Sequence, residues 1–407
     1  YTLALLIISG LFIPISANKA NYVKAGDFLQ TRGEVYFSFD VGEKSKIIEL
    51  KDIISIVKIK GNRIFAYANK ETFTKFMKYD LNYETLTPPS MVGPAPKMSN
   101  YRNQNLEKWD KYPTYQGYLN IMENFQKNYP DKVKLYNPGN SIKGKKILVA
   151  EVSANVSKRE NEPKFLHTST IHGDEVTGYV FLLRMIDYFL KEYGSDHRVT
   201  KLIDSASIFF APLLNPDGTY AESDSSVQGA TRYNSRYVDL NRDYQYPGGG
   251  KNPQPESRAL IDFQTQHRFV MSIDFHDGME CFLYPWAYKA GHPNDKEWFG
   301  TVCREYVDAV HKVNPNTFND KSGSAAILYY IAKGIRSDHQ LYKDHCRGVT
   351  IELSSVQVID ESVLLKYWNY HKDAVLDFYM EMFNGIRGNV KTVKDNDLVG
   401  VPVKVSV

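Results

Sequence analysis

Strand-like runs alternate with helical patterns along most of the chain, and this alternation limits the possible folds more than any other feature. Apolar runs typical of buried strands occur at residues 146–153, 165–171, 208–214, 269–275 and 348–353. A helical period of 3.6 residues is followed by Val176, Tyr179, Leu182, Leu183, Ile186 and Leu190. A second helical pattern covers residues 361–383. The alternation predicts an α/β domain with a mixed, mostly parallel central sheet flanked by helices.

Turn-forming residues divide the chain into units. Residues 88–96 contain four prolines and one glycine, which no helix or central strand tolerates, so this stretch is predicted to be a linker. Before it, residues 21–87 alternate apolar and polar side chains and predict a small N-terminal β-rich domain. After it, residues 97–384 form the α/β domain. Residues 385–407 return to a period of two and predict the start of a C-terminal β-sandwich.

The first twenty residues are an apolar run too short to span a bilayer comfortably, followed by small residues. We interpret residues 1–20 as part of a signal peptide that is cleaved near Ala17 or Ala20; a buried first strand or helix is the alternative. With only three cysteines, stability does not depend on a disulfide framework. These features predict a secreted or bacterial envelope protein without a stable membrane span in its mature form.

The charge balance excludes one class of partner. Lys and Arg number 50 and Asp and Glu number 47, a near-neutral balance with no basic stripe of the kind that binds nucleic acid. Function must therefore be sought in a localised site.

His172 and Glu175 lie three residues apart where a predicted strand ends and a helix begins. Alone, such a pair is more often solvent-facing or a helix cap. His276 ends another predicted strand, and strand ends are where sites collect in α/β sheets. A catalytic Zn²⁺ needs three protein ligands and one open position, and His172, Glu175 and His276 are candidates for the three ligands.

Two further features fit chemistry beside a metal. Glu352 is a carboxylate inside an apolar strand, where a charge is costly unless it is paired or functional, and it is a candidate general base. Arg232, Asn241 and Arg242 lie in one loop and could hold a carboxylate and a developing oxyanion. Surface ion pairing is the alternative for each arginine.

Together, these residues resemble the zinc metallocarboxypeptidase family, with its carboxypeptidase A and B, T, and N/E groups. The resemblance covers roughly Trp109 to Phe383. It is carried, in family order, by Ile171-His-Gly-Asp-Glu-Val-Thr-Gly178, Leu213-Leu-Asn-Pro-Asp-Gly218, Val238-Asp-Leu-Asn-Arg242, Phe275-His-Asp-Gly278 and Thr350-Ile-Glu-Leu353.

The resemblance implies an enzyme that releases single C-terminal residues from peptides or proteins. One Zn²⁺ would be held by His172, Glu175 and His276, and its bound water would be activated by Glu352. Arg232 would stabilise the oxyanion.

The substrate carboxylate would be held, on the same resemblance, by Asn241, Arg242 and Tyr330. Tyr330 precedes Glu352 by twenty-two residues, as in the family, although Tyr329 is adjacent to it. The resemblance also extends to residues 385–407, which are similar to the start of the transthyretin-like domain of the N/E group. Nothing in the sequence indicates an oligomeric state.

The chain departs from the family at the positions that select the substrate side chain. Ala287 stands where the N/E group has an acidic residue, and Ser337 stands where the A and B groups have an aliphatic residue or an aspartate. Asp274, two residues before His276, is a candidate for binding Lys or Arg side chains, or it only orients a neighbour. Asp174 replaces the Arg or Asn common between the first two ligands.

Several interpretations remain open at this stage. The chain could be an inactive relative that binds peptides or acts in adhesion, or the substrate could be a peptidoglycan stem peptide or a small acylated amino acid. The N-terminal unit could be a propeptide that blocks the cleft or an accessory domain.

Overall fold

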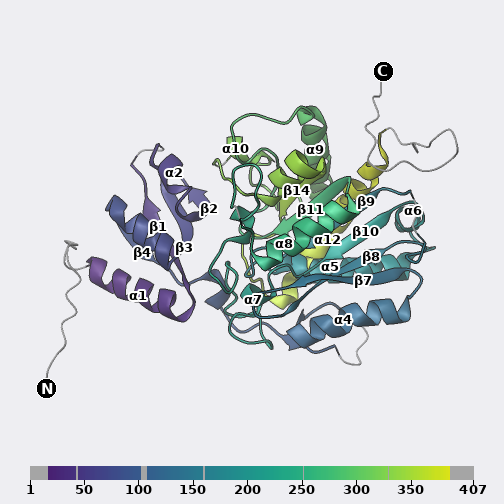
Figure 1. The fold of residues 1–407 in the computed structure, drawn as a ribbon, viewed down its shortest axis with the longest axis horizontal. Coiled ribbons are helices and arrows are strands. Elements are labelled where there is room, and N and C mark those ends of the chain that lie inside the picture. The colour runs from purple at the N-terminus through teal and green to yellow at the C-terminus, as the bar shows by residue number, and fades with distance from the viewer. Residues whose placement is uncertain are drawn as a thin grey trace.

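The computed structural model describes residues 17–42, 45–101, 108–158, 161–250, 252–328 and 330–385. Figure 1 shows a smaller unit built from α1 to β4, on the left, and a larger unit that contains the remaining labelled elements. Between them, the chain forms a single 3₁₀ turn over Pro89–Met91.

The smaller unit is a four-stranded antiparallel sheet with the strand order β2-β3-β1-β4. Its core is rich in phenylalanine, and the ring of Phe37 contacts those of Phe39, Phe73 and Phe76. The predicted strands are present, but the unit also contains helices that the alternation did not reveal. Its elements are α1 (Ala17–Thr31), β1 (Glu34–Asp40), α2 (Ser45–Leu50), β2 (Ser55–Lys60), β3 (Arg63–Asn69), α3 (Lys70–Phe76) and β4 (Tyr83–Thr85).

The proposed signal peptide lies mostly at residues 1–16, outside the described residues. The two suggested cleavage positions, Ala17 and Ala20, fall in the first turn of α1. Likewise, residues 386–407 lie outside the described part of the chain, so the C-terminal β-sandwich stays a prediction.

The larger unit is built on an eight-stranded sheet with the order β13-β12-β14-β11-β9-β10-β8-β7. Four neighbouring pairs are parallel and three are antiparallel, which confirms the mixed, mostly parallel sheet. The strands are β7 (Val133–Asn140), β8 (Lys146–Val152), β9 (Lys164–Ser169), β10 (Ser207–Ala211), β11 (Met271–His276), β12 (Cys281–Tyr284), β13 (Gly323–Ser324) and β14 (Arg347–Glu352).

Helices cover both faces of this sheet, which is why its strands are apolar on both sides. In β10, Ile208 and Phe210 enter one hydrophobic cluster while Phe209 and Ala211 enter another on the opposite face. The helices are α4 (Tyr115–Asn128), α5 (Thr177–Glu192), α6 (His197–Ser205), α7 (Pro216–Thr219), α8 (Pro255–His267), α9 (Lys296–Val313), α10 (Ala325–Leu328), α11 (Arg336–His339) and α12 (Leu364–Met380).

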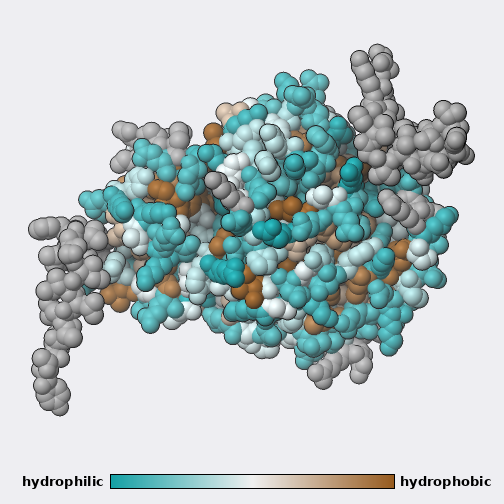
Figure 2. Space-filling view, in the orientation of Figure 1, coloured by the Kyte–Doolittle hydropathy of each residue, from teal (hydrophilic) through white to brown (hydrophobic). Residues whose placement is uncertain are grey.

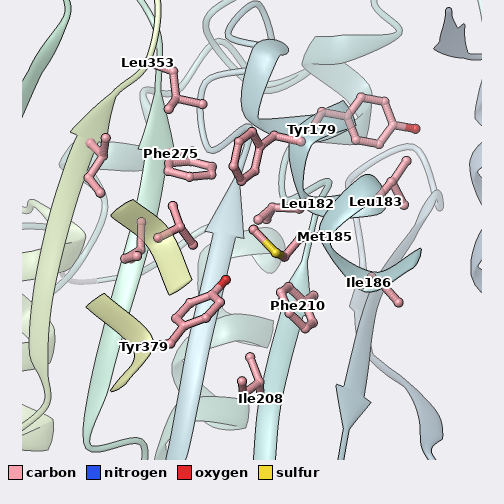
Figure 3. Packing of buried hydrophobic residues seen from close by; sticks show 14 of the residues in the cluster. Tyr179, Leu182, Leu183, Met185, Ile186, Ile208, Phe210, Phe275, Leu353 and Tyr379 are labelled. Carbon is pink, nitrogen blue, oxygen red and sulfur yellow. The ribbon is translucent and has the colours of Figure 1, made fainter. Parts of the chain in front are cut away.

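The larger cluster forms where α5 packs on the sheet. Figure 3 shows Leu182, Met185 and Ile186 of this helix beside Phe210 of β10, with Phe275 of β11 close by. Leu182 is fully buried, so replacing it by alanine is expected to cost about 2–5 kcal/mol. This rigid contact fixes the start of α5, and therefore the turn before it, against the ends of the central strands.

The face shown in Figure 2 is mainly hydrophilic, with apolar residues only in small separate groups. Among the helices of the described residues, none combines the length and apolar character needed to cross a bilayer. The three cysteines are buried and form no disulfide.

Candidate metal centre and active site

Three adjacent parallel strands bring the predicted metal ligands together. The strands β14, β11 and β9 are neighbours in the sheet, and all three point the same way, so their carboxyl ends meet at one edge. His276 and Glu352 end β11 and β14 and are paired in register. His172 follows the end of β9 by three residues.

The turn between β9 and α5 has a shape that its sequence requires. A side chain at Gly173 would place its Cβ 2.4 Å from the carbonyl carbon of Gly218, so only glycine fits. Beyond the turn, Asp277 caps α5 by accepting a hydrogen bond of 2.9 Å from the Thr177 N–H. His172 and Glu175 are thereby held on one side of the turn.

The three predicted ligands converge. The Nδ1 atom of His172 lies 2.9 Å from Oε1 of Glu175, and Nδ1 of His276 lies 2.7 Å from Oε2 of the same carboxylate. All three side chains are buried, and their candidate ligand atoms lie within 4.8 Å of one another. Two imidazole nitrogens and one carboxylate are a donor set that suits a catalytic Zn²⁺, so these residues fit the metal that the sequence predicts.

The second nitrogen of each imidazole also has a carboxylate partner. Nε2 of His172 lies 3.1 Å from Asp239, and Nε2 of His276 lies 3.3 Å from Asp274. A carboxylate that accepts the Nε2 proton leaves the Nδ1 lone pair free for a metal and fixes the ring. Sequence analysis did not single out Asp239, although its place two residues before Asn241 in the quoted motif was a usable signal.

The carboxylates of the site have opposite pKa shifts. Burial alone would raise the pKa of Glu175, but the imidazoles of His172 and His276 outweigh burial and hold that pKa well below its usual range. Burial and the nearby Glu175 carboxylate raise the pKa of Glu352 to about 8. The Oε2 atom of Glu352 has no hydrogen-bond partner among the described residues, so this carboxyl group is available to an incoming molecule.

The predicted substrate-holding residues lie around the same cavity. Arg232 contacts Glu175 at 3.2 Å and Asp239 at 3.1 Å, and its side chain is buried. Arg242 donates to the Tyr330 hydroxyl at 3.1 Å. Asn241 accepts a hydrogen bond from the Arg336 N–H at 2.9 Å. The residues of the larger unit that line the cavity are His172, Glu175, Arg232, Asn241, Arg242, His276, Asp277, Met279, Leu283, Tyr284, Ala287, Ala325, Tyr330, Ala332, Ile335, Ser337, Thr350 and Glu352.

One predicted substrate-binding residue lies elsewhere. Asp274 is not among the residues that line the cavity; it is buried behind them, against His276 and Arg336. Ala287 and Ser337 do line it. Sequence analysis predicted no role for Arg336, because the sequence around this first residue of α11 carries no signal of its burial.

The smaller unit completes the cavity. Residues Ile56 to Ile59 of its edge strand β2 line the cavity from the other side, and the register of β2 is irregular between Ile56 and Lys58. The Tyr330 hydroxyl donates to the carbonyl oxygen of Ile56 at 2.5 Å. The sequence left open whether this unit blocks the cleft or is an accessory domain, and it did not indicate which strand approaches the cavity.

Three further contacts join the smaller unit to the site. Ser55 Oγ donates to Asp239 at 2.7 Å, and the Tyr67 hydroxyl donates to Asp174 at 3.1 Å. The Glu34 carboxylate accepts the backbone N–H groups of Arg232 and Tyr233 at 3.2 and 3.1 Å. The smaller unit thus contacts the neighbours of the metal ligands as well as the cavity itself.

Comparisons with known proteins give a consistent result. A sequence profile described as zinc carboxypeptidase matches residues 118–374. Carboxypeptidase D of Anas platyrhynchos is 28% identical over 344 residues, covering 76% of this chain and 24% of the relative. The carboxypeptidase N catalytic chain of Mus musculus is 28% identical over 321 residues, covering 68% of this chain and 70% of the relative. The chain therefore spans about a quarter of the length of the carboxypeptidase D relatives.

Solved structures agree on the fold. The carboxypeptidase A from Helicoverpa armigera has a TM-score of 0.67 at 17% identity, over 86% of this chain and 98% of that one. Thrombin activatable fibrinolysis inhibitor (TAFI) has a TM-score of 0.65 at 17% identity, over 86% of this chain and 99% of that one.

Proposed function

The chain belongs to the zinc carboxypeptidase family, and on this premise we propose that it hydrolyses the C-terminal peptide bond of peptides or proteins and releases single amino acids. The observation that carries the proposal is the convergence of the His172, Glu175 and His276 ligand atoms within 4.8 Å, in one cavity with Glu352. The inactive alternative expects one of these residues to be missing.

Each side chain has a distinct part in the proposed reaction. Zinc, when bound by His172, Glu175 and His276, supplies Lewis acidity that makes water more acidic and polarises a carbonyl. Glu352 takes the proton from the attacking water and passes it to the leaving amine.

The remaining polar residues position the substrate. Arg232 holds the oxygen that becomes negative as water adds, and its buried position makes this interaction strong. Asn241, Arg242 and Tyr330 hold the terminal carboxylate. Since this carboxylate must be within their reach, only the last peptide bond lies beside Glu352, which accounts for release of one residue at a time.

The test is to incubate the zinc-loaded chain with peptides varied at the last position and to identify the released products by mass spectrometry. Single terminal amino acids are expected, and a metal chelator should abolish their release until Zn²⁺ is restored. Release of internal fragments would refute the proposal, as would binding of peptides without any cleavage after the exposed segment at Val92 to Ala95 has been cut and the smaller unit removed. A peptidoglycan stem peptide included in the set tests that alternative substrate.

We further propose that the smaller unit keeps the chain latent by occupying the substrate cleft. Support comes from Ile56 to Ile59, which line the cavity, and from the Ile56 carbonyl, which uses the Tyr330 hydroxyl intended for a substrate carboxylate. A peptide cannot use these positions until the smaller unit moves away. Proteolysis within the exposed segment at Val92 to Ala95 is expected to raise the hydrolysis rate.

A location outside the cytoplasm, secreted or in a bacterial envelope, is part of the proposal and rests on the apolar first residues of the sequence.

A further inference from the structure

Arg336 is a fully buried cation immediately behind the cavity. Its chain neighbours Ile335 and Ser337 line the cavity, while its own side chain points away from solvent with an exposed fraction of 0%. Nη2 donates to Gln264 at 3.1 Å, but Nε and Nη1 have no hydrogen-bond acceptor among the described residues. A buried guanidinium needs a compensating anion, and Asp274 lies 3.6 Å from Nη1.

Asp274 is the anion of this pair and is also separated from the cavity by its partners. It is paired in register with Thr168 on β9 and Thr350 on β14, and Thr350 lines the cavity. Its Oδ1 accepts from Thr168 Oγ1 at 2.6 Å. Its Oδ2 is shared between Arg336 at 3.6 Å and Nε2 of His276 at 3.3 Å. Both oxygens are thus engaged within the protein.

The wall that faces a substrate side chain is neutral. Some lining residues of the larger unit are already assigned to the metal, to catalysis or to the terminal carboxylate. Among the other described residues of that unit that line the cavity, the only acidic or basic side chain is Asp277, which caps α5. The remainder are apolar or carry a single hydroxyl: Met279, Leu283, Tyr284, Ala287, Ala325, Ala332, Ile335, Ser337 and Thr350. A lysine or arginine side chain entering here would lose its hydration, and the carboxylate of Asp277 offers it no accessible oxygen, because Oδ2 accepts from the Thr177 N–H and Oδ1 is buried.

We propose that the Asp274–Arg336 ion pair determines the substrate class of the site: Arg336 neutralises Asp274 and keeps it on His276, so the pocket accepts uncharged, apolar C-terminal residues. The proposal rests on the carboxypeptidase function and deepens it. Arg336 is a specificity-determining residue that does not touch the substrate side chain, and Asp274 is a positioning residue for a metal ligand.

Two single substitutions should have opposite effects on the full zinc-loaded chain. R336M removes the cation and keeps a long apolar side chain, so the uncompensated Asp274 should raise kcat/KM for C-terminal lysine relative to leucine by at least roughly tenfold, as one new charge partner allows. D274N leaves the cation alone, so it should lower the lysine-to-leucine ratio and raise the glutamate-to-leucine ratio. The double variant R336M/D274N should return near the parent ratio.

The measurement uses peptides identical except for a last residue of Leu, Phe, Lys or Glu, with released residues counted by mass spectrometry. The ratio of one released residue to another does not depend on the fraction of chains in which the smaller unit has moved away from the cavity. The matched control is R347M, which removes an arginine that is partly exposed and pairs with Asp295 on the surface; its ratios should equal those of the parent.

Zinc competition against a chelator gives a second readout that needs no turnover. D274N should weaken zinc binding by roughly 10- to 100-fold, because His276 loses the carboxylate that orients it, whereas R347M should not. If R336M does not fold, the released-residue ratios and the zinc affinity of D274N alone test the role of the ion pair.

The outcomes separate the two proposals. Unchanged ratios in folded R336M or D274N, or a parent that prefers lysine, would overturn the role of the ion pair. A parent that releases no terminal residue from any of the four peptides, even after cleavage at Val92 to Ala95 and removal of the smaller unit, would refute the carboxypeptidase function itself.

Discussion

Ser55 offers the most direct test of latency, because its hydroxyl joins the smaller unit to the metal site. Its Oγ donates to Asp239 at 2.7 Å and accepts from the Tyr233 hydroxyl at 3.0 Å, and the side chain is buried. In the substitution Ser55→Ala, Asp239 loses one donor and Tyr233 loses its acceptor while the cavity stays otherwise intact. Asp239 keeps Arg232 and His172 as partners.

The expected magnitude follows from the charge on the acceptor. In a capped chain the smaller unit covers the cavity, and in an open chain it has moved away. A hydrogen bond to a charged group contributes about 1.5–3 kcal/mol, so Ser55→Ala should shift the equilibrium between capped and open chains roughly 10- to 150-fold towards the open form. The hydrolysis rate of the intact chain should rise by the same factor while open chains remain the minority. The rate after the linker is cut and the protein diluted should be unchanged.

The assay is the initial rate on a short peptide before and after cleavage of the linker. The control is Lys60→Ala, at the exposed end of β2 and away from the cavity, which should leave both rates unaltered. An intact Ser55→Ala chain no faster than the parent would show that the smaller unit does not limit access. An equal rise before and after cleavage would show that the substitution acts on catalysis instead.

Three other substitutions test the proposed base, the partner of a metal ligand and the pH dependence of latency. Glu352→Gln should leave zinc binding near the parent value, measured by metal analysis, and lower kcat by roughly 10²–10⁴-fold; near-parental activity would show that another group is the base. Asp239→Asn should weaken zinc binding by roughly 10- to 100-fold in a chelator competition, and unchanged affinity would contradict its orienting role. Burial and Asp174 raise the pKa of Glu34 from 4.5 to about 8 in the capped form. Capping should therefore be strongest below pH 4.5 and weaken as the pH rises towards 8, and Glu34→Gln should flatten this dependence in rates of intact chain against pH.

The motifs of the larger unit could be recognised in the sequence because each is short and consists of residues adjacent in the chain. The strand before His172, the strand that ends at His276 and the strand that ends at Glu352 each gave an apolar run of the predicted length, and the structure has them within a few residues. Ligands at the ends of parallel strands must come close together, so the residue types and their places predicted a zinc site before any coordinates.

The role of the residues near the substrate side chain was harder to predict from the sequence. Asp274 was a candidate for binding basic side chains because it shares a strand face with His276. Whether a carboxylate faces a pocket or a buried cation depends on the nearest charge in space, and Arg336 is 62 residues away in the chain.

The sequence by itself determined the α/β class and predicted the three candidate metal ligands and the candidate base, because periodicity and short motifs are encoded by neighbours in the chain. Only the tertiary structure decided that β2 of the smaller unit faces the cavity, that Asp239 contacts His172, and that Asp274 pairs with Arg336. These are contacts between side chains far apart in sequence, and their energies depend on burial and distance, which no local pattern of residues records.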